Sequence, residues 1–188
     1  DLASYVASVQ RNPRELQELY HSFLIKVSAF MRDLPAWQGL SYQIQQIVAK
    51  APKGAEVRAW SAGCATGEEA YSLAICLLDA CAERDDVRIK VYATDLDEDA
   101  LATGRLGSYT AAQLSNLDAG QIARHFVAGG GKYRVNKRLR RCVVFGRHDI
   151  LRDPPLPKLD VIACRNVLIY LEPEHRNTAL QLLSAALK

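Results

Sequence analysis

The sequence lacks the features that define several classes of protein. No apolar run reaches the roughly 18 residues of a membrane-spanning helix, and the first residues (Asp-Leu-Ala-Ser) do not resemble a signal peptide. The five cysteines are odd in number and include no Cys-x-x-Cys pair, which argues against a zinc cluster or a disulfide framework. We therefore expect a cytoplasmic protein with no membrane insertion and no metal site.

Neither sign of charge dominates the composition. The 188 residues include 24 Lys and Arg against 21 Asp and Glu, a net charge of +3, and 49% of the residues are hydrophobic. A charge this small does not by itself indicate a nucleic-acid partner, and none is expected. The length and composition are those of one globular domain, or of one domain with a small appendage.

The chain divides into a helical beginning and an alternating remainder. Residues 1–50 place apolar side chains at helical spacing in two stripes, within 16–24 and 37–48. From residue 51 to residue 188, short apolar runs alternate with helical stretches, which predicts a doubly wound parallel α/β sheet. The expected domains are therefore a helical segment at 1–50 and an α/β core at 51–188. We expect strands at 56–60, 87–94 and 159–164, and helices at 68–82, 97–104 and 173–187.

A small antiparallel unit is expected inside this core. A helical stretch at 114–127 is followed by a glycine run, and a basic link joins two short apolar runs at 132–135 and 141–145. We expect these two runs to pair as an inserted β subdomain at 128–146. A doubly wound sheet usually continues with further strands, so we expect that its C-terminal strands are missing and that the exposed sheet edge allows dimerisation.

A glycine turn connects the first strand to the long helix, at the place where open α/β sheets bind ligands. It reads Gly63-Cys-Ala-Thr-Gly67-Glu68-Glu69, and its small residues allow a ligand to approach the backbone closely. The glycine spacing fails the Gly-x-Gly-x-x-Gly template of dinucleotide sites. Two acids at the start of a helix suit an ammonium group better than a phosphate. The same acids would complement the helix dipole in a plain turn, so both interpretations stay open.

Polar residues follow two further strands at the same edge of the sheet. Asp95 ends the run Tyr-Ala-Thr-Asp, where an acid can accept hydrogen bonds from two ribose hydroxyls, while Asp97 is a fair N-cap for the next helix. Arg165 and Asn166 directly follow the apolar run Val-Ile-Ala-Cys, which places them beside the same crevice. An ion pair inside the fold is the alternative role for the arginine. Together the motifs favour a nucleoside-containing ligand.

In this order and spacing the motifs resemble the chemotaxis receptor methyltransferases of the CheR family. The resemblance rests on Gly-Cys-Ala-Thr-Gly-Glu-Glu-Ala-Tyr-Ser, Tyr-Ala-Thr-Asp-Leu-Asp, Cys-Arg-Asn-Val-Leu-Ile-Tyr and, at 27–33, Val-Ser-Ala-Phe-Met-Arg-Asp. The helix ahead of the core resembles versions fused to a methylesterase. The resemblance implies a fold of the S-adenosylmethionine-dependent methyltransferase type. It also implies methylation of receptor glutamate side chains, which yields the γ-methyl ester and S-adenosylhomocysteine.

The resemblance also implies roles for individual residues. Glu68 would face the methionine ammonium, Asp95 the ribose hydroxyls, and Asp149 and Ile150 the adenine. A glutamate acceptor is already ionised at pH 7, so the reaction needs no general base. The implied cofactor site comprises Ser28, Arg32, Gly63, Glu68, Asp95, Asp149, Ile150, Arg165 and Asn166, with Arg32 and Tyr170 flanking the transferred methyl group.

The partner implied by the resemblance is the cytoplasmic helical domain of chemoreceptors. The stretch Lys132–Arg147 has seven basic residues and no acid, so it would attract an acidic receptor helix. Such charges also protect a solvated hairpin from edge pairing, which is the alternative role. Two other functions stay open. One is a non-catalytic module that senses S-adenosylmethionine in a larger signalling protein, and the other is a nucleic-acid methyltransferase that uses the basic strip.

Overall fold

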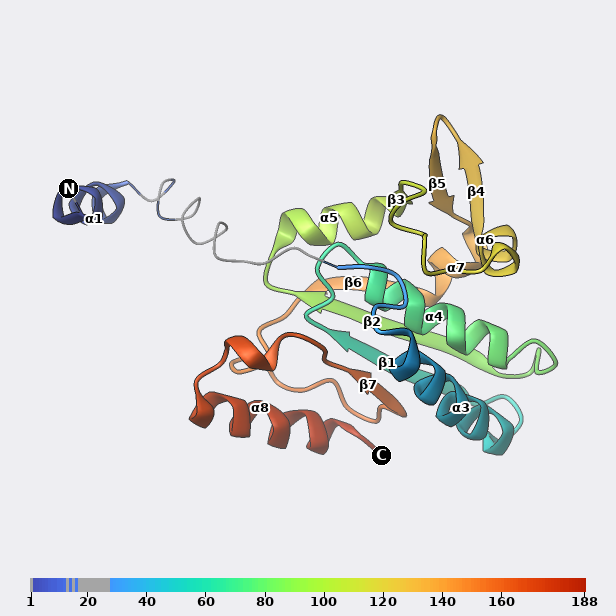
Figure 1. Cartoon of the computed structure of the whole chain (residues 1–188). Helices are drawn as coiled ribbons and strands as arrows, with labels where there is room; N and C mark the ends of the chain where they lie inside the picture. The colour runs from blue at the N-terminus through green and yellow to red at the C-terminus, as the bar shows by residue number, and fades with distance from the viewer. Residues whose placement is uncertain (1, 13, 15, 17–27) are drawn as a thin grey trace.

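The computed structural model describes residues 2–12, 14, 16 and 28–188, and a four-stranded parallel sheet forms its centre (Figure 1). The strands are β1 (Glu56–Ala62), β2 (Arg88–Asp95), β6 (Val143–Arg147) and β7 (Val161–Ala163), in the order β6-β2-β1-β7. The chain runs outward from β1 through β2 to β6 and then returns to β7 on the other side of β1. Ligands bind at such a reversal, beside the carboxyl ends of the strands.

Helices cover both faces of this sheet. The helices α3 (Leu34–Lys50) and α4 (Glu68–Ala80) pack on one face, and α8 (Pro173–Ala186) packs on the other (Figure 1). Strand β1 alternates accordingly: Val57 and Ala59 join the core under α3 and α4, whereas Trp60 and Ala62 join the core under α8. Burial on both faces explains why apolar side chains of β1 occur on both sides of the strand.

The remaining helices are short. They are α1 (Leu2–Arg11), α5 (Glu98–Leu106), α6 (Ala119–His125), α7 (Lys137–Cys142) and the 3-10 helix η1 (Leu168–Tyr170). Asp97 caps α5 by accepting hydrogen bonds from the backbone N–H groups of Asp99 and Ala100, so the alternative role considered for it is confirmed. Among the residues described, no helix has the length and apolarity needed to cross a membrane.

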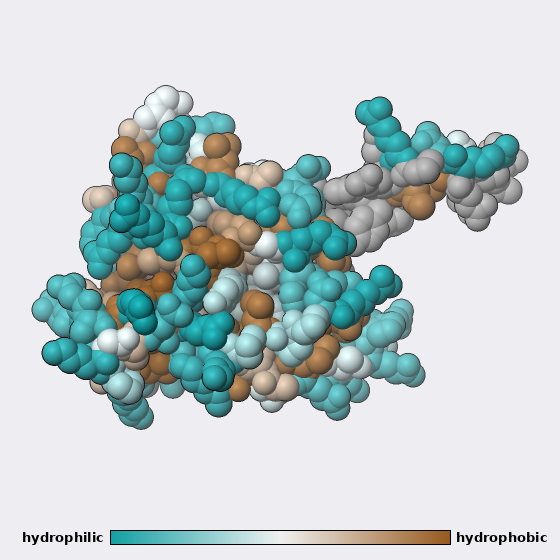
Figure 2. All heavy atoms as spheres, turned by 180° about the vertical axis from the view of Figure 1, so that it is seen from behind, coloured by the Kyte–Doolittle hydropathy of each residue, from teal (hydrophilic) through white to brown (hydrophobic). Residues whose placement is uncertain are grey.

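A small antiparallel sheet lies beside the central one and differs from the expectation. It contains β3 (Ser108–Tyr109), β5 (Lys132–Val135) and β4 (Phe126–Gly129), in that order. The expected pairing of 132–135 with 141–145 is wrong, because β6 pairs in parallel with β2 and the basic link before it forms α7. Figure 2 shows the molecule from behind, with hydrophilic residues over most of the surface and hydrophobic residues gathered below the small sheet.

The other predicted elements are present with shifted ends. The expected strands correspond to β1, β2 and β7, and the expected helices to α3, α4, α5 and α8. The helix expected at 114–127 is wrong in extent, because α6 begins only after the capping box of Asp118 and Gln121 and ends where β4 begins. The helical stripe expected within 16–24 lies, except for Leu16, outside the described residues.

We predict opposite effects of alanine at two glycines. Gly63 has a φ of 79°, and a Cβ there would lie 2.3 Å from Val167 Cγ2, so Gly63→Ala should destabilise the protein by about 2 kcal/mol or more. Gly39 lies inside α3 with nothing within 4 Å of the added Cβ, so Gly39→Ala should stabilise it by about 0.5–1 kcal/mol. Urea unfolding of both variants measures these changes, and equal shifts of the two midpoints would contradict the structure.

Candidate functional site

A cavity of about 480 Å³ opens at the carboxyl ends of the four central strands. Its lining residues come from the stretch before α3 and the first turn of α3, the turn after β1 and the start of α4, the end of β2 and the start of α5, the loop after β6, and the loop after β7 with η1. All but one of the residues predicted from the sequence line it, namely Ser28, Arg32, Gly63, Asp95, Asp149, Ile150, Arg165, Asn166 and Tyr170. The fold thus gathers in one place residues that span most of the described chain.

The end of β2 holds the glycine turn in place. The backbone N–H groups of Gly63 and Cys64 both donate to the carbonyl oxygen of Thr94, at 2.8 and 2.9 Å. The Asp95 carboxylate accepts the N–H of Ala65 at 2.8 Å through Oδ2 and the N–H of Asp97 at 3.0 Å through Oδ1. These bonds orient the carboxylate in the cavity wall, and each oxygen keeps a second lone pair for a ligand hydroxyl.

Of the two acids at the start of α4, Glu69 lines the cavity, whereas the resemblance assigned the contact with the methionine ammonium to Glu68. Glu68 is 1% exposed and is not part of the cavity wall. Its carboxylate accepts hydrogen bonds from the Thr66 hydroxyl at 2.6 Å and from Gln113 Nε2 at 3.0 Å. Glu69 lines the cavity and accepts the Ser61 hydroxyl at 2.7 Å. The sequence signal for Glu69 was present, since both acids stand at the start of the helix.

Glu69 is poised to change its protonation state near neutral pH. Burial raises the pKa of its carboxyl to about 7, although the hydrogen bond from Ser61 and the positive charge of Arg165 act in the opposite direction. Together, Ser61 and Arg165 do not fully offset the effect of lost hydration on this pKa. A ligand ammonium placed near this carboxylate would supply the missing compensation, because an adjacent positive charge favours the ionised form.

A short stretch before α3, residues 28–33, lines the cavity through Ser28, Ala29 and Arg32 and is here called the strap. The N–H of Met31 donates to Ser72 Oγ at 3.0 Å, and Met31 and Asp33 both adopt left-handed backbone angles, with φ of 46° and 63°. The guanidinium of Arg165 donates to the carbonyl oxygen of Arg32 and lies 3.2 Å from the Asp33 carboxylate. Arg165 therefore has two roles, since it lines the cavity and holds the strap through these two contacts.

The loop after β6 supplies an apolar wall. Asp149 Oδ1 accepts the N–H of Leu151 at 2.9 Å, and this local bond shapes the turn that presents Ile150 and Leu151 to the cavity. His148 also lines the cavity, and its ring packs edge-on against Trp60 at 5.2 Å. The sequence did not indicate a cavity role for His148, because no motif distinguishes it from the other histidines.

The loop after β7 completes the cavity. Asn166 has a left-handed φ of 58°, a conformation that asparagine adopts more easily than most residues. Tyr170, in η1, is 60% exposed although it lines the cavity, so its ring is accessible from outside. Among the described residues no cluster of three or more metal-ligating side chains is present.

The residues in the wall fit the cofactor that the resemblance implies. A buried acid suits the methionine ammonium, and a carboxylate at the end of β2 suits the ribose hydroxyls. The apolar side chains of Leu96, Ile150 and Leu151 suit a flat base. The volume is also within the range of small-molecule sites.

Comparisons with known proteins are consistent with this geometry. The model of the family described as "CheR methyltransferase, SAM binding domain" matches residues 26–188. A chemotaxis protein methyltransferase of Listeria innocua is 34% identical over 92% of the chain, and one of Salmonella typhimurium is 31% identical over 100%. The chain spans 64% and 66% of the lengths of these two relatives.

Two further similarities differ in kind from these. A 104.1 kDa protein of Rhodobacter capsulatus is 36% identical over the whole chain, which spans 20% of that protein. Among solved structures, the DszA carbon methyltransferase matches with a TM-score of 0.51 and 16% identity, over 81% of this chain and 31% of that one. At this identity the structural likeness supports the fold alone.

We predict that the affinity for S-adenosylhomocysteine rises with pH through the titration of Glu69. Below pH 7 this carboxyl is protonated and does not attract the ammonium of the ligand, so affinity should rise roughly tenfold from pH 6 to pH 8. Calorimetric titration at several pH values measures this dependence. Glu69→Gln should bind more weakly with a flat profile, whereas Glu83→Gln, at an exposed position, should keep the wild-type slope. A Glu69→Gln profile as steep as the wild type would contradict the assignment.

Proposed function

The chain belongs to the CheR methyltransferase family, whose SAM-binding domain it matches, and from this premise we propose that it methylates glutamate side chains of chemoreceptors. The products are the glutamate γ-methyl ester and S-adenosylhomocysteine. One observation carries the proposal: Arg32 and Tyr170, the two residues expected beside the acceptor, line the same cavity as Glu69 and Asp95. A cofactor-binding wall and an accessible acceptor-binding wall therefore share one space.

The residues of the cavity bind and orient the cofactor in this proposal. Glu69 holds the ammonium and Asp95 the ribose hydroxyls. Ile150 lies beside the base, and the strap contacts the cofactor through Ser28 and Arg32. S-Adenosylmethionine, when bound, supplies a sulfonium methyl group that a carboxylate can attack in line. The backbone bonds that fix the glycine turn and Asp95 keep this wall rigid before the ligand arrives, which lowers the cost of binding.

The acceptor needs orientation more than activation. A glutamate side chain is ionised at pH 7, so no protein group has to remove a proton. The Arg32 guanidinium attracts the incoming carboxylate, and the Tyr170 hydroxyl donates a hydrogen bond that orients it. Alignment of the two reacting groups supplies most of the acceleration.

We propose that the basic stretch 132–147 contacts the receptor. Six basic residues between 132 and 147 are exposed, and the stretch has no acid, so it presents a positive surface to an acidic receptor helix. Arg140, the remaining basic residue, instead donates to the carbonyl oxygens of Arg105 and Leu106. The six exposed residues are Lys132, Arg134, Lys137, Arg138, Arg141 and Arg147.

We predict that Asp95→Ala strongly weakens cofactor binding. The substitution removes the acceptor for the ribose hydroxyls and frees the N–H of Ala65, so affinity for S-adenosylhomocysteine should fall about a hundredfold, equivalent to ~2.7 kcal/mol. Asp85→Ala removes an exposed carboxylate and should bind as the wild type does. Titration calorimetry compares the three proteins. If Asp95→Ala bound with wild-type affinity, Asp95 would not be the residue that contacts the ribose hydroxyls.

We predict that Tyr170→Phe lowers methyl transfer and leaves cofactor affinity unchanged. Loss of the hydroxyl removes one orienting bond to the acceptor, so the rate should fall about tenfold or more. The assay follows labelled methyl groups from S-adenosylmethionine into cytoplasmic fragments of chemoreceptors, and release of the label as methanol by alkali identifies the ester. The control Tyr42→Phe changes an exposed ring of α3 and should transfer at the wild-type rate.

Two outcomes of this assay would contradict the proposal. Label that resists alkali would indicate an acceptor other than a carboxylate. Binding of S-adenosylhomocysteine without transfer to any receptor fragment would instead support a module that senses the cofactor.

A further inference from the structure

Residues 109–116, here called the brace, contact two segments beside the cofactor cavity, namely the glycine turn with the start of α4, and the strap. Three side chains of the brace make these contacts. The Tyr109 hydroxyl donates to the carbonyl oxygen of Thr66 in the glycine turn, at 2.8 Å. Gln113 Nε2 donates to Glu68 Oε1 at 3.0 Å, and Asn116 Nδ2 donates to the carbonyl oxygen of Phe30 in the strap, also at 3.0 Å. None of these three residues lines the cavity itself.

A chain of hydrogen bonds also joins the start of α4 to the strap. Gln113 holds the Glu68 side chain, and the Glu68 carbonyl oxygen accepts the Ser72 hydroxyl at 2.7 Å. Ser72 Oγ in turn accepts the N–H of Met31 in the strap at 3.0 Å. The start of α4, which presents Glu69 to the cavity, and the strap, which presents Arg32, are therefore held by one continuous network.

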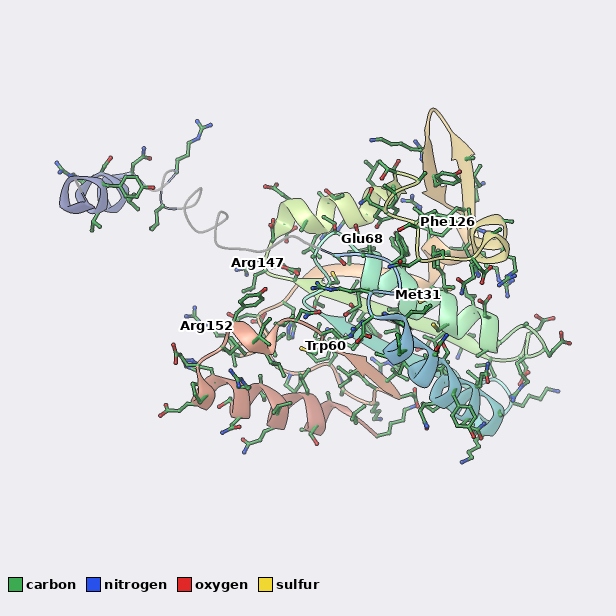
Figure 3. The ribbon with its side chains drawn as sticks, in the orientation of Figure 1. Met31, Trp60, Glu68, Phe126, Arg147 and Arg152 are labelled. Atoms are coloured by element: carbon green, nitrogen blue, oxygen red, sulfur yellow. The ribbon has the colours of Figure 1, made fainter. Side chains whose placement is uncertain are left out.

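An aromatic cluster connects the same strap to the small antiparallel sheet. The Phe30 ring is fully buried and makes edge contacts with Tyr109 of β3 at 4.9 Å and with Phe126 of β4 at 5.5 Å. Met31, Glu68 and Phe126 lie around the first turns of α4 (Figure 3). The strap is thus packed against the small sheet on one side and open to the cavity on the other.

We propose that the brace is a positioning element of the cofactor site, in which Gln113 and Asn116 hold the start of α4 and the strap in their binding arrangement. This inference rests on the proposed function and extends it to residues that contact neither cofactor nor acceptor. The strap needs such support because Met31 and Asp33 adopt left-handed angles that cost free energy when they are not held. Glu68 needs it because a buried carboxylate without donors is strongly disfavoured.

The test uses three substitutions that change one amide to an acid. Gln113→Glu keeps the acceptor for Thr110 and loses the donor to Glu68, and Asn116→Asp loses the donor to Phe30. The matched control is Gln121→Glu in α6, which adds the same charge close by and keeps the acceptor for the N–H of Asp118. Titration with S-adenosylhomocysteine gives the dissociation constants, and circular dichroism with thermal unfolding shows which variants are folded.

Folded Gln113→Glu and Asn116→Asp should bind S-adenosylhomocysteine about tenfold more weakly than the wild type, and Gln121→Glu within about twofold. Wild-type affinity in the first two variants would overturn the proposal. If the wild type itself does not bind, the proposed function fails instead, so the two failures are distinguishable.

Hydrogen exchange of the wild type provides a second measurement, which does not depend on whether the variants fold. Binding of S-adenosylhomocysteine should slow exchange in peptides over 109–116 and in the strap, and leave exchange in α8 unchanged. Unchanged exchange over 109–116 at saturating ligand would overturn the proposal even if the variants do not fold.

Discussion

The register of β1 on β2 is the constraint on which the rest of the site depends. Ala62 pairs with Thr94 in a parallel ladder, and the next two N–H groups of the chain both donate to the Thr94 carbonyl oxygen. This arrangement bends the chain into the glycine turn, starts α4 at Glu68 and places Asp95 against the N–H of Ala65. A slip of one strand by one residue would exchange the side chains that face α3 and α4 with those that face α8, so the core and the site require the same register.

The architecture and most of the site were predictable because they depend on local patterns. Apolar runs bounded by turn residues identified β1, β2 and β7, and the order of strands and helices identified a parallel sheet. Residues that directly follow such strands meet at one edge, so the cavity contains Asp95, Arg165 and Asn166 as expected. The resemblance to the CheR family is confirmed by the family model, and it supplied the residues that strand endings alone do not identify, such as Arg32 and Tyr170.

Other features depend on partners that lie far away in the sequence. From the sequence alone, the run at 132–135 is suited to pair with the run at 141–145. In the structure, β5 (132–135) pairs with β3 and β4, and β6 pairs with β2. The choice between Glu68 and Glu69 depends on the rotation of α4, because adjacent helical residues point about 100° apart. That rotation follows from the packing of the buried face of α4, and the two acids then meet different partners: Glu68 accepts from Gln113, 45 residues away, and Glu69 from Ser61 on β1.

The fastening of the strap by Arg165 has a consequence for the newly made protein. The guanidinium and the Arg32 carbonyl that it binds are 133 residues apart in the sequence, and the loop that presents the guanidinium follows β7, the last of the described strands. Contacts of such long separation form late, since the chain leaves the ribosome from its N-terminus. A nascent chain that ends before β7 lacks the guanidinium that holds the strap. The strap therefore stays without this contact until translation has passed Arg165.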